Sequence, residues 1–253
     1  MNSIFDIIGV PFQYVLNFFH MFTGGTYALA ILVFTIAVNA AMIPLTVKQQ
    51  KSMAKQARLR PKLDALQKKY GDDRVKMANA QQELYQNENI SPTGGCLPMF
   101  IRMLVLMGVY RAVYRIIETG TSVNFNLFGL DLSQTPNFTA GWQPIWIIPI
   151  LSFVASVLSM LVSQLQQRKI NPQAASGGGA MIGMMLFMPL FSLYIAFNVQ
   201  GAVGYYWIIS NIVGTGIQLI VNSMYSANKI LAKNTLDEGL KRRQYEAPRI
   251  KNK

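Results

Sequence analysis

The chain has 253 residues, of which 51% are hydrophobic and only 13% are charged, about half the charged share of a soluble domain. Three runs, 7–47, 132–167 and 170–228, contain no Lys, Arg, Asp or Glu, whereas a membrane-spanning helix needs about 20 apolar residues. This pattern excludes a soluble enzyme and predicts an all-α integral membrane protein with several spans.

The net charge of +12 comes mainly from three basic blocks, at 48–76, 168–169 and 229–253. Short cytoplasmic loops of membrane proteins are enriched in Lys and Arg in this way. The charge is therefore explained by topology, and we expect no specific nucleic-acid binding. The single Cys96 excludes an intramolecular disulfide.

Residues 1–24 predict an interfacial amphipathic helix on the outer leaflet, because apolar side chains alternate there with Asp6, Gln13, Asn17 and His20. Pro11 is expected to start or kink this helix. The first membrane span then runs from about Tyr27 to Val47. If residues 1–24 instead crossed the membrane, they would form a sixth span.

Residues 48–96 predict a cytoplasmic helical hairpin. Gly71 ends the first arm, and Asp73 is the expected N-cap of the second. Pro61 is expected to kink the first arm or to begin a new helix. Apolar residues at helical spacing form one narrow stripe on each arm and fit antiparallel packing: Leu63, Leu66 and Tyr70, then Met77, Ala80 and Leu84.

Four further spans are predicted, at about Leu97–Ile117, Trp142–Ser163, Ala180–Phe197 and Val203–Met224. The first of these is weakly apolar because it carries Arg102, Arg111 and Arg115. It is required nonetheless, since the basic blocks before and after the four spans belong on the same side of the membrane. The prediction is therefore a five-helix core at 25–47 and 97–224. Its N-terminus is outside, and its basic tail, 225–253, is cytoplasmic.

Polar residues within spans are candidates for function because they are costly in a bilayer. The set is Thr35, Asn39, Arg102, Ser210, Asn211, Thr215 and Gln218, together with a serine stripe at 152, 156, 159 and 163. Hydrogen bonding between helices is the alternative role for the Ser, Thr, Asn and Gln side chains. Arg102 has no acidic residue in any span to pair with, so we expect it in a polar pocket at the depth of Asn39. Arg111 and Arg115 are expected to reach the outer interface.

Several motifs, in this order, resemble those of the YidC/Oxa/Alb membrane-protein insertases, in the short form typical of Gram-positive bacteria. They are Met42-Ile-Pro-Leu-Thr-Val-Lys-Gln49, Arg60-Pro61-Lys-Leu, Gln67-Lys-Lys-Tyr70, Glu83-Leu-Tyr85, Gly94-Gly-Cys-Leu-Pro98 and Tyr206-Trp-Ile-Ile-Ser-Asn211 followed by Gln218. The resemblance covers nearly the whole chain.

The resemblance implies a monomeric, non-enzymatic insertase in the bacterial plasma membrane, whose cytoplasm-open groove receives nascent membrane proteins and releases them into the phospholipid bilayer. The insertase would act alone or with the Sec translocon, and its basic tail would contact the ribosome. The hairpin would capture substrates, and its basic residues are the candidates: Lys48, Lys51, Lys55, Arg58, Arg60, Lys62, Lys68 and Lys69.

One departure from the family concerns the groove charge. The family usually has Arg five residues before the first-span Pro, where this chain has Asn39, and Gln at the position of Arg102. Our hypothesis is that the charge has moved from one helix to its neighbour at the same depth.

Two other classes were weighed against the insertase. A small-solute transporter or channel also needs polar groups within the membrane, but no inverted repeat is evident. An intramembrane enzyme would need catalytic residues, and the spans contain no Ser/His pair, paired carboxylates or set of metal ligands. We therefore predict no catalytic residue, no metal and no cofactor.

Overall fold

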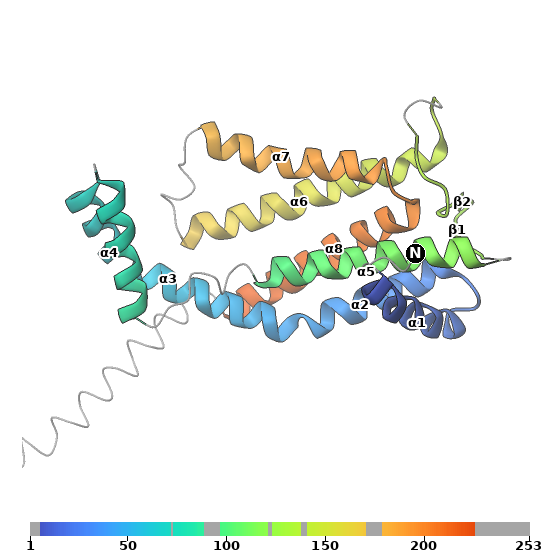
Figure 1. Cartoon of the computed structure of the whole chain (residues 1–253), viewed down its shortest axis with the longest axis horizontal. Helices are drawn as coiled ribbons and strands as arrows, with labels where there is room; N and C mark the ends of the chain where they lie inside the picture. The colour runs from blue at the N-terminus through green and yellow to red at the C-terminus, as the bar shows by residue number, and fades with distance from the viewer. Residues whose placement is uncertain are drawn as a thin grey trace, which may run out of the picture. The chain divides into compact units, whose positions relative to one another are not determined.

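The computed structural model describes residues 6–71, 73–88, 97–120, 123–137, 141–170 and 179–225, and most of these are helical (Figure 1). Cys96 and the tail from 226 onward lie outside the described residues. The helices are α1 (Asp6–Phe22), α2 (Tyr27–Ala41), α3 (Ile43–Tyr70), α4 (Arg74–Asn87), α5 (Leu97–Thr119), α6 (Ile147–Ile170), α7 (Gly179–Ala196) and α8 (Gly201–Met224).

The chain divides into two compact units. The first unit contains Met1–Ile43 and Met99–Gln218, and the second contains Pro44–Pro98 and Leu219–Lys253. The first unit therefore holds α1, α2, α6, α7 and most of α5 and α8. The second holds most of α3 together with α4, so the predicted hairpin is a separate unit from the predicted helical core.

The N-terminal helix is distinct from the helix that follows it. The axes of α1 and α2 differ by 114°, and the turn between them contains Gly24 and Gly25 with φ of 67° and 81°. These positive values favour glycine. Pro11 lies inside α1 rather than at its start, so the expectation that Pro11 begins the helix was wrong.

The predicted first span is interrupted at Met42. The amide of Met42 donates to the carbonyls of Val38 at 3.0 Å and Asn39 at 3.2 Å, which closes α2. Pro44 then lies in the first turn of α3, where its missing N–H costs nothing. Helix α3 continues through Pro61 to Tyr70, so no new helix begins at Pro61.

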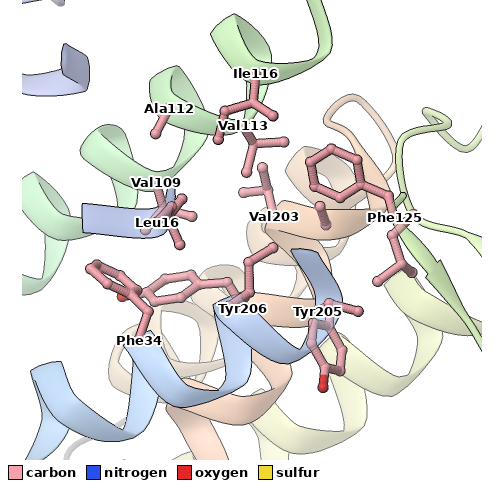
Figure 2. Packing of buried hydrophobic residues seen from close by; sticks show 14 of the residues in the cluster. Leu16, Phe34, Val109, Ala112, Val113, Ile116, Phe125, Val203, Tyr205 and Tyr206 are labelled. Atoms are coloured by element: carbon pink, nitrogen blue, oxygen red, sulfur yellow. The ribbon is translucent and has the colours of Figure 1, made fainter. Parts of the chain in front are cut away.

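The buried core of the first unit joins four helices (Figure 2). Leu16 of α1 and Phe34 of α2 are buried, as are Val109 of α5 and Val203 of α8. Close approach of α1 to α5 requires glycine, because a Cβ on Gly108 would lie 2.8 Å from the Phe12 ring. This packing brings together α2, α5 and α8, the three helices that carry Asn39, Arg102 and Gly214.

Two further features complete the first unit. Helices α6 and α7 run side by side (Figure 1), and a 3-10 turn, η3 (Pro144–Trp146), precedes α6. A short antiparallel hairpin, β1 (Asn126–Leu127) and β2 (Leu130–Asp131), was not predicted. Its tip is Phe128-Gly129, and both residues have positive φ, the backbone that a two-residue hairpin turn requires.

Two described helices are long and apolar enough to span a membrane, Pro144–Gln166 and Gly201–Met224, and a third candidate arises if α1 and α2 are one bent span. Helix α2 has only 15 residues, about 22 Å, against about 30 Å of hydrocarbon. The three arginines of α5 lower its hydropathy. The helical membrane class is therefore confirmed, whereas the number of five spans stays a prediction.

In the second unit, α3 and α4 form a hairpin. Asp73 caps α4 as expected, because its carboxylate accepts hydrogen bonds from the amides of Val75 and Lys76. Lys62 of α3 forms an ion pair with Glu88 at the end of α4. The predicted apolar stripe residues of both arms are half-buried, while most of their neighbours are exposed.

Candidate functional site

Asn39 on α2 is buried, with 7% of its surface exposed. Its side-chain nitrogen donates to the carbonyl of Thr35, one turn earlier, at 2.8 Å. The hydroxyl of Thr35 in turn donates to the carbonyl of Ile31 at 2.6 Å. Each side chain therefore makes one donor hydrogen bond within α2, and the acceptor oxygen of Asn39 lies near another helix.

Arg102 on α5 and this oxygen both lie close to Gly214 of α8. A Cβ added to Gly214 would lie 3.3 Å from Nη2 of Arg102 and 3.3 Å from Oδ1 of Asn39. Both groups therefore approach the same point on the backbone of α8, where glycine leaves room for them. Asn39 and Arg102 therefore both lie beside a third helix, and their sharing of one polar pocket stays a prediction.

Tyr206 and Ser210 of α8 lie at the same site. The hydroxyl of Tyr206 interacts with Ser210 and is within electrostatic reach of the Arg102 charge. Tyr206 is 5% exposed, whereas the Arg102 side chain is exposed. Among the described residues Arg102 has no carboxylate partner. The site thus combines one accessible positive charge with an amide oxygen and hydroxyl groups.

The other two arginines of α5 are arranged differently. Nη2 of Arg111 lies 2.9 Å from Oδ1 of Asp6 on α1, and Nη1 of Arg115 lies 3.4 Å from the same oxygen. Arg115 also donates through Nε to Gln13 at 2.9 Å. Arg111 and Arg115 therefore share a carboxylate of α1, which was not predicted, and their reach to the outer interface stays a prediction.

A ladder of polar contacts joins α6 and α8. Asn211 donates to Ser156 at 3.3 Å and Thr215 donates to Ser159 at 2.9 Å. Gln218 contacts Ser163 at 3.2 Å and Gln166 at 2.9 Å. Nearer the start of both helices, the Ser152 hydroxyl donates to the carbonyl of Gly204 at 3.0 Å.

In this ladder, the predicted serine stripe of α6 is hydrogen-bonded to the predicted polar stripe of α8, at one helical turn after another. Such contacts between membrane helices are worth about 0.6 kcal/mol each. Asn211, Thr215 and Gln218 therefore have the interhelical role weighed above, whereas Ser210 belongs with Arg102 and Tyr206. The seven predicted residues are not one cluster: Asn39 and Arg102 approach Gly214, Ser210 interacts with Tyr206, and Thr35 accepts a hydrogen bond from Asn39.

Several residues of the site were missed from the sequence. Gly214 has no functional group, so a search for polar or reactive residues does not select it. It matters because it leaves space for its neighbours. Tyr206 was noted only as part of a motif. Gln166 is 8% exposed, and it was missed because the charges that follow it place it at the edge of its span.

The basic residues of the hairpin have separate surroundings. Lys51 lies over the ring of Tyr225 at 5.3 Å and Lys69 over that of Tyr70 at 4.9 Å. A hydrogen bond with Tyr70 raises the pKa of Lys69. Lys48, Lys55 and Lys68 are exposed, while the side chains of Arg58 and Arg60 lie outside the described part. No potential metal site of three or more His, Cys, Asp or Glu occurs among the described residues.

These features define a class of protein: a helical integral membrane protein that carries polar side chains, including one solvent-accessible arginine, among its apolar helices. Comparison with known proteins then gives the family. Residues 18–229 match the family model described as the 60Kd inner membrane protein. The chain therefore belongs to this family, the YidC/Oxa/Alb family that its motifs resemble.

Two relatives illustrate the extent of the similarity. The chain is 30% identical to membrane protein insertase YidC 2 of Listeria innocua over 247 residues, which cover 96% of this chain and 78% of that protein. It is 33% identical to membrane protein insertase YidC of Shewanella halifaxensis over 215 residues, which cover 85% of this chain but only 36% of the relative. The chain thus spans about a third of the length of the Shewanella relative.

Proposed function

We propose that the protein is a membrane protein insertase without catalytic residues. Its substrates are nascent membrane proteins, and it acts alone or with the Sec translocon. The observation that carries the proposal is the approach of Arg102 and Asn39 to Gly214, with Arg102 accessible and without a carboxylate partner among the described residues. Family membership and the names of the relatives support the same activity.

The proposed mechanism is electrostatic. An arginine near the middle of a span costs about 2.5–3.5 kcal/mol, so it is retained where water or a substrate compensates for the cost. We infer that Arg102 lies in a groove open to the cytoplasm. It attracts the acidic outer segment of a substrate more strongly there than in bulk water, because the surroundings have a lower dielectric constant.

We further propose that Arg102 supplies the charge that the family usually has at the position of Asn39. The two side chains come from neighbouring helices and approach the same point of α8. A guanidinium carried by α2 or by α5 would therefore occupy the same region next to Gly214. The ladder of α6 and α8 would hold together the wall along which the apolar helix of the substrate leaves.

The proposed topology has five spans, at 25–47 and 97–224, with α1 on the outer surface and the tail in the cytoplasm. The chain acts as a monomer in the bacterial plasma membrane. The hairpin of α3 and α4 captures substrates through exposed lysines such as Lys48, Lys55 and Lys68. The basic tail contacts the ribosome.

Reconstitution into liposomes tests the activity. A single-span substrate with a short acidic outer tail is added, and its insertion is scored by protease protection. We expect protection with wild type and at least a tenfold loss with Arg102→Ala, which corresponds to about 1.4 kcal/mol. Arg102→Lys should retain most of the activity, because it keeps the charge.

A matched substrate with a neutral tail is the control. It should insert equally with wild type and with Arg102→Ala. If folded wild type gives no protection above empty liposomes for either substrate, the insertase assignment for the protein acting alone is wrong, and transport of a small solute becomes the hypothesis to examine. Equal loss for both substrates would contradict the electrostatic mechanism.

A further inference from the structure

A cavity of about 290 Å³ lies between α1, the last turn of α5 and the segment before β1. It is at the end of α5 opposite Arg102. Helix α1 contributes Gln13, Asn17 and His20, which are spaced i, i+4 and i+7 and so share one face. The remaining lining comes from Tyr27, Ile116, Thr119, Gly120 and Val123.

The polar atoms of α1 in this cavity are mostly donors. The side-chain oxygen of Gln13 accepts a hydrogen bond from Nε of Arg115 at 2.9 Å. The side-chain oxygen of Asn17 accepts one from the hydroxyl of Tyr27, also at 2.9 Å. Since both amide oxygens are already bonded, each side chain has its NH₂ group left to offer. The cavity therefore suits a ligand rich in acceptor oxygens.

The charges around the cavity also favour a ligand with acceptor oxygens, such as an anion. None of the residues that line it is a carboxylate. Asp6, the acidic residue of α1, lies between Arg111 and Arg115 and is neutralised by them. Glu118 of α5 interacts with Tyr114 and is not among the residues that line the cavity. An anion entering the cavity thus meets donors without a competing negative charge.

The surface next to the cavity is apolar and exposed. Tyr14, Phe18 and Met21 are 71%, 55% and 79% exposed, and each follows a cavity residue of α1 by one position. The two stripes therefore lie side by side, about 100° apart around the helix. A ligand that fills the cavity with a polar head has an adjacent surface for hydrocarbon chains.

We propose that this cavity binds the phosphodiester headgroup of a phospholipid whose acyl chains lie along Tyr14, Phe18 and Met21. The NH₂ groups of Gln13 and Asn17 donate to the phosphate oxygens. The proposal rests on the insertion of the helical core in a bilayer and is independent of the insertase activity.

The test uses the full chain in an uncharged maltoside detergent and measures binding of dihexanoyl phosphatidylglycerol by isothermal titration calorimetry. Gln13→Glu and Asn17→Asp are the informative variants. Each keeps the acceptor oxygen that Arg115 or Tyr27 uses, but each replaces the NH₂ donor with a negatively charged oxygen. We expect each to weaken lipid binding at least tenfold without lowering the midpoint of thermal unfolding.

Gln82→Glu, at an exposed position of α4, is the control for charge and should bind as wild type does. Two other ligands identify the part that is recognised: inorganic phosphate, which lacks chains, and dihexanoylglycerol, which lacks phosphate. Both should bind at least tenfold more weakly than the phospholipid. Equal binding of either one, or unchanged lipid binding by a folded Asn17→Asp variant, would overturn the proposal.

Discussion

A Cβ on Gly214 of α8 would lie 3.3 Å from the guanidinium of Arg102 on α5 and 3.3 Å from the side-chain oxygen of Asn39 on α2. Side chains of two helices therefore approach the third at a position where a residue larger than glycine would make them shift. This arrangement is the basis of our proposal that Arg102 supplies the charge that the family usually has at the position of Asn39.

Gly214→Ala should disturb this contact. The added methyl would be closer to both groups than most Cβ contacts are, and the flexible end of Arg102 can move more readily than the buried Asn39. We expect insertion of an acidic-tail substrate to fall severalfold. The matched control is Gly216→Ala, where a Cβ would have open space. That variant should keep its activity and gain up to about 1 kcal/mol in stability, because alanine favours the helix. Equal activity of the two variants would contradict the close contact at Gly214.

The ladder between α6 and α8 predicts a measurable coupling. Thr215 and Ser159 share a hydrogen bond of 2.9 Å, so Thr215→Val and Ser159→Ala should each lower the free energy of unfolding. A double-mutant cycle should give a coupling energy of about 0.6 kcal/mol, the average for such pairs between membrane helices. Additive effects would mean that the two residues do not stabilise each other.

Asp6 should be important for holding α1 against α5. Asp6→Asn leaves Arg111 and Arg115 without their shared carboxylate, and charged hydrogen bonds of this kind contribute about 1.5–3 kcal/mol. We expect a loss of about 2 kcal/mol in the free energy of unfolding and faster hydrogen exchange throughout α1. Glu118→Gln, which removes the same charge at an exposed position of α5, should cost less than about 0.5 kcal/mol. Equal losses would show that the ion pair is not responsible.

The cap of α4 predicts a dependence on pH. Hydrogen bonds from the backbone of Lys76, then from its side chain and from the Val75 amide, hold the pKa of Asp73 below its ordinary value. The ionised carboxylate therefore stabilises the helix start above the unfolded pKa of about 3.9. This contribution is lost as the pH falls through the folded pKa.

The measurement is hydrogen exchange at the amides of Val75 and Lys76. Their protection factors should fall in this acidic range in wild type and stay level in Asp73→Asn, whose amide oxygen still accepts but does not titrate. Parallel curves for the two proteins would contradict the prediction.

The sequence predicted those features that depend on local pattern. The end of α3 at Tyr70, the Asp73 cap of α4 and the boundaries of α5 and α8 follow from spacing, capping and hydropathy. The predicted polar stripes of α6 and α8 are also present in the structure. A single sequence does not show whether two such stripes face each other or line a groove.

Contacts between distant segments were harder to foresee. The ion pair of Asp6 with Arg111 joins residues 105 positions apart, and no periodicity links them. The break at Met42 was missed because Pro44 is compatible both with the end of a span and with the first turn of a new helix. Gly214 matters through what it lacks, so no chemistry-based search of the sequence would select it.

The most direct test of the central claim compares insertion of the acidic-tail substrate by three reconstituted proteins: wild type, Arg102→Gln and the double variant Asn39→Arg/Arg102→Gln. If one shared site needs one guanidinium from either helix, Arg102→Gln should lose at least tenfold and the double variant should recover most of that loss. A folded double variant as inactive as Arg102→Gln would contradict the claim that the two positions supply the same site.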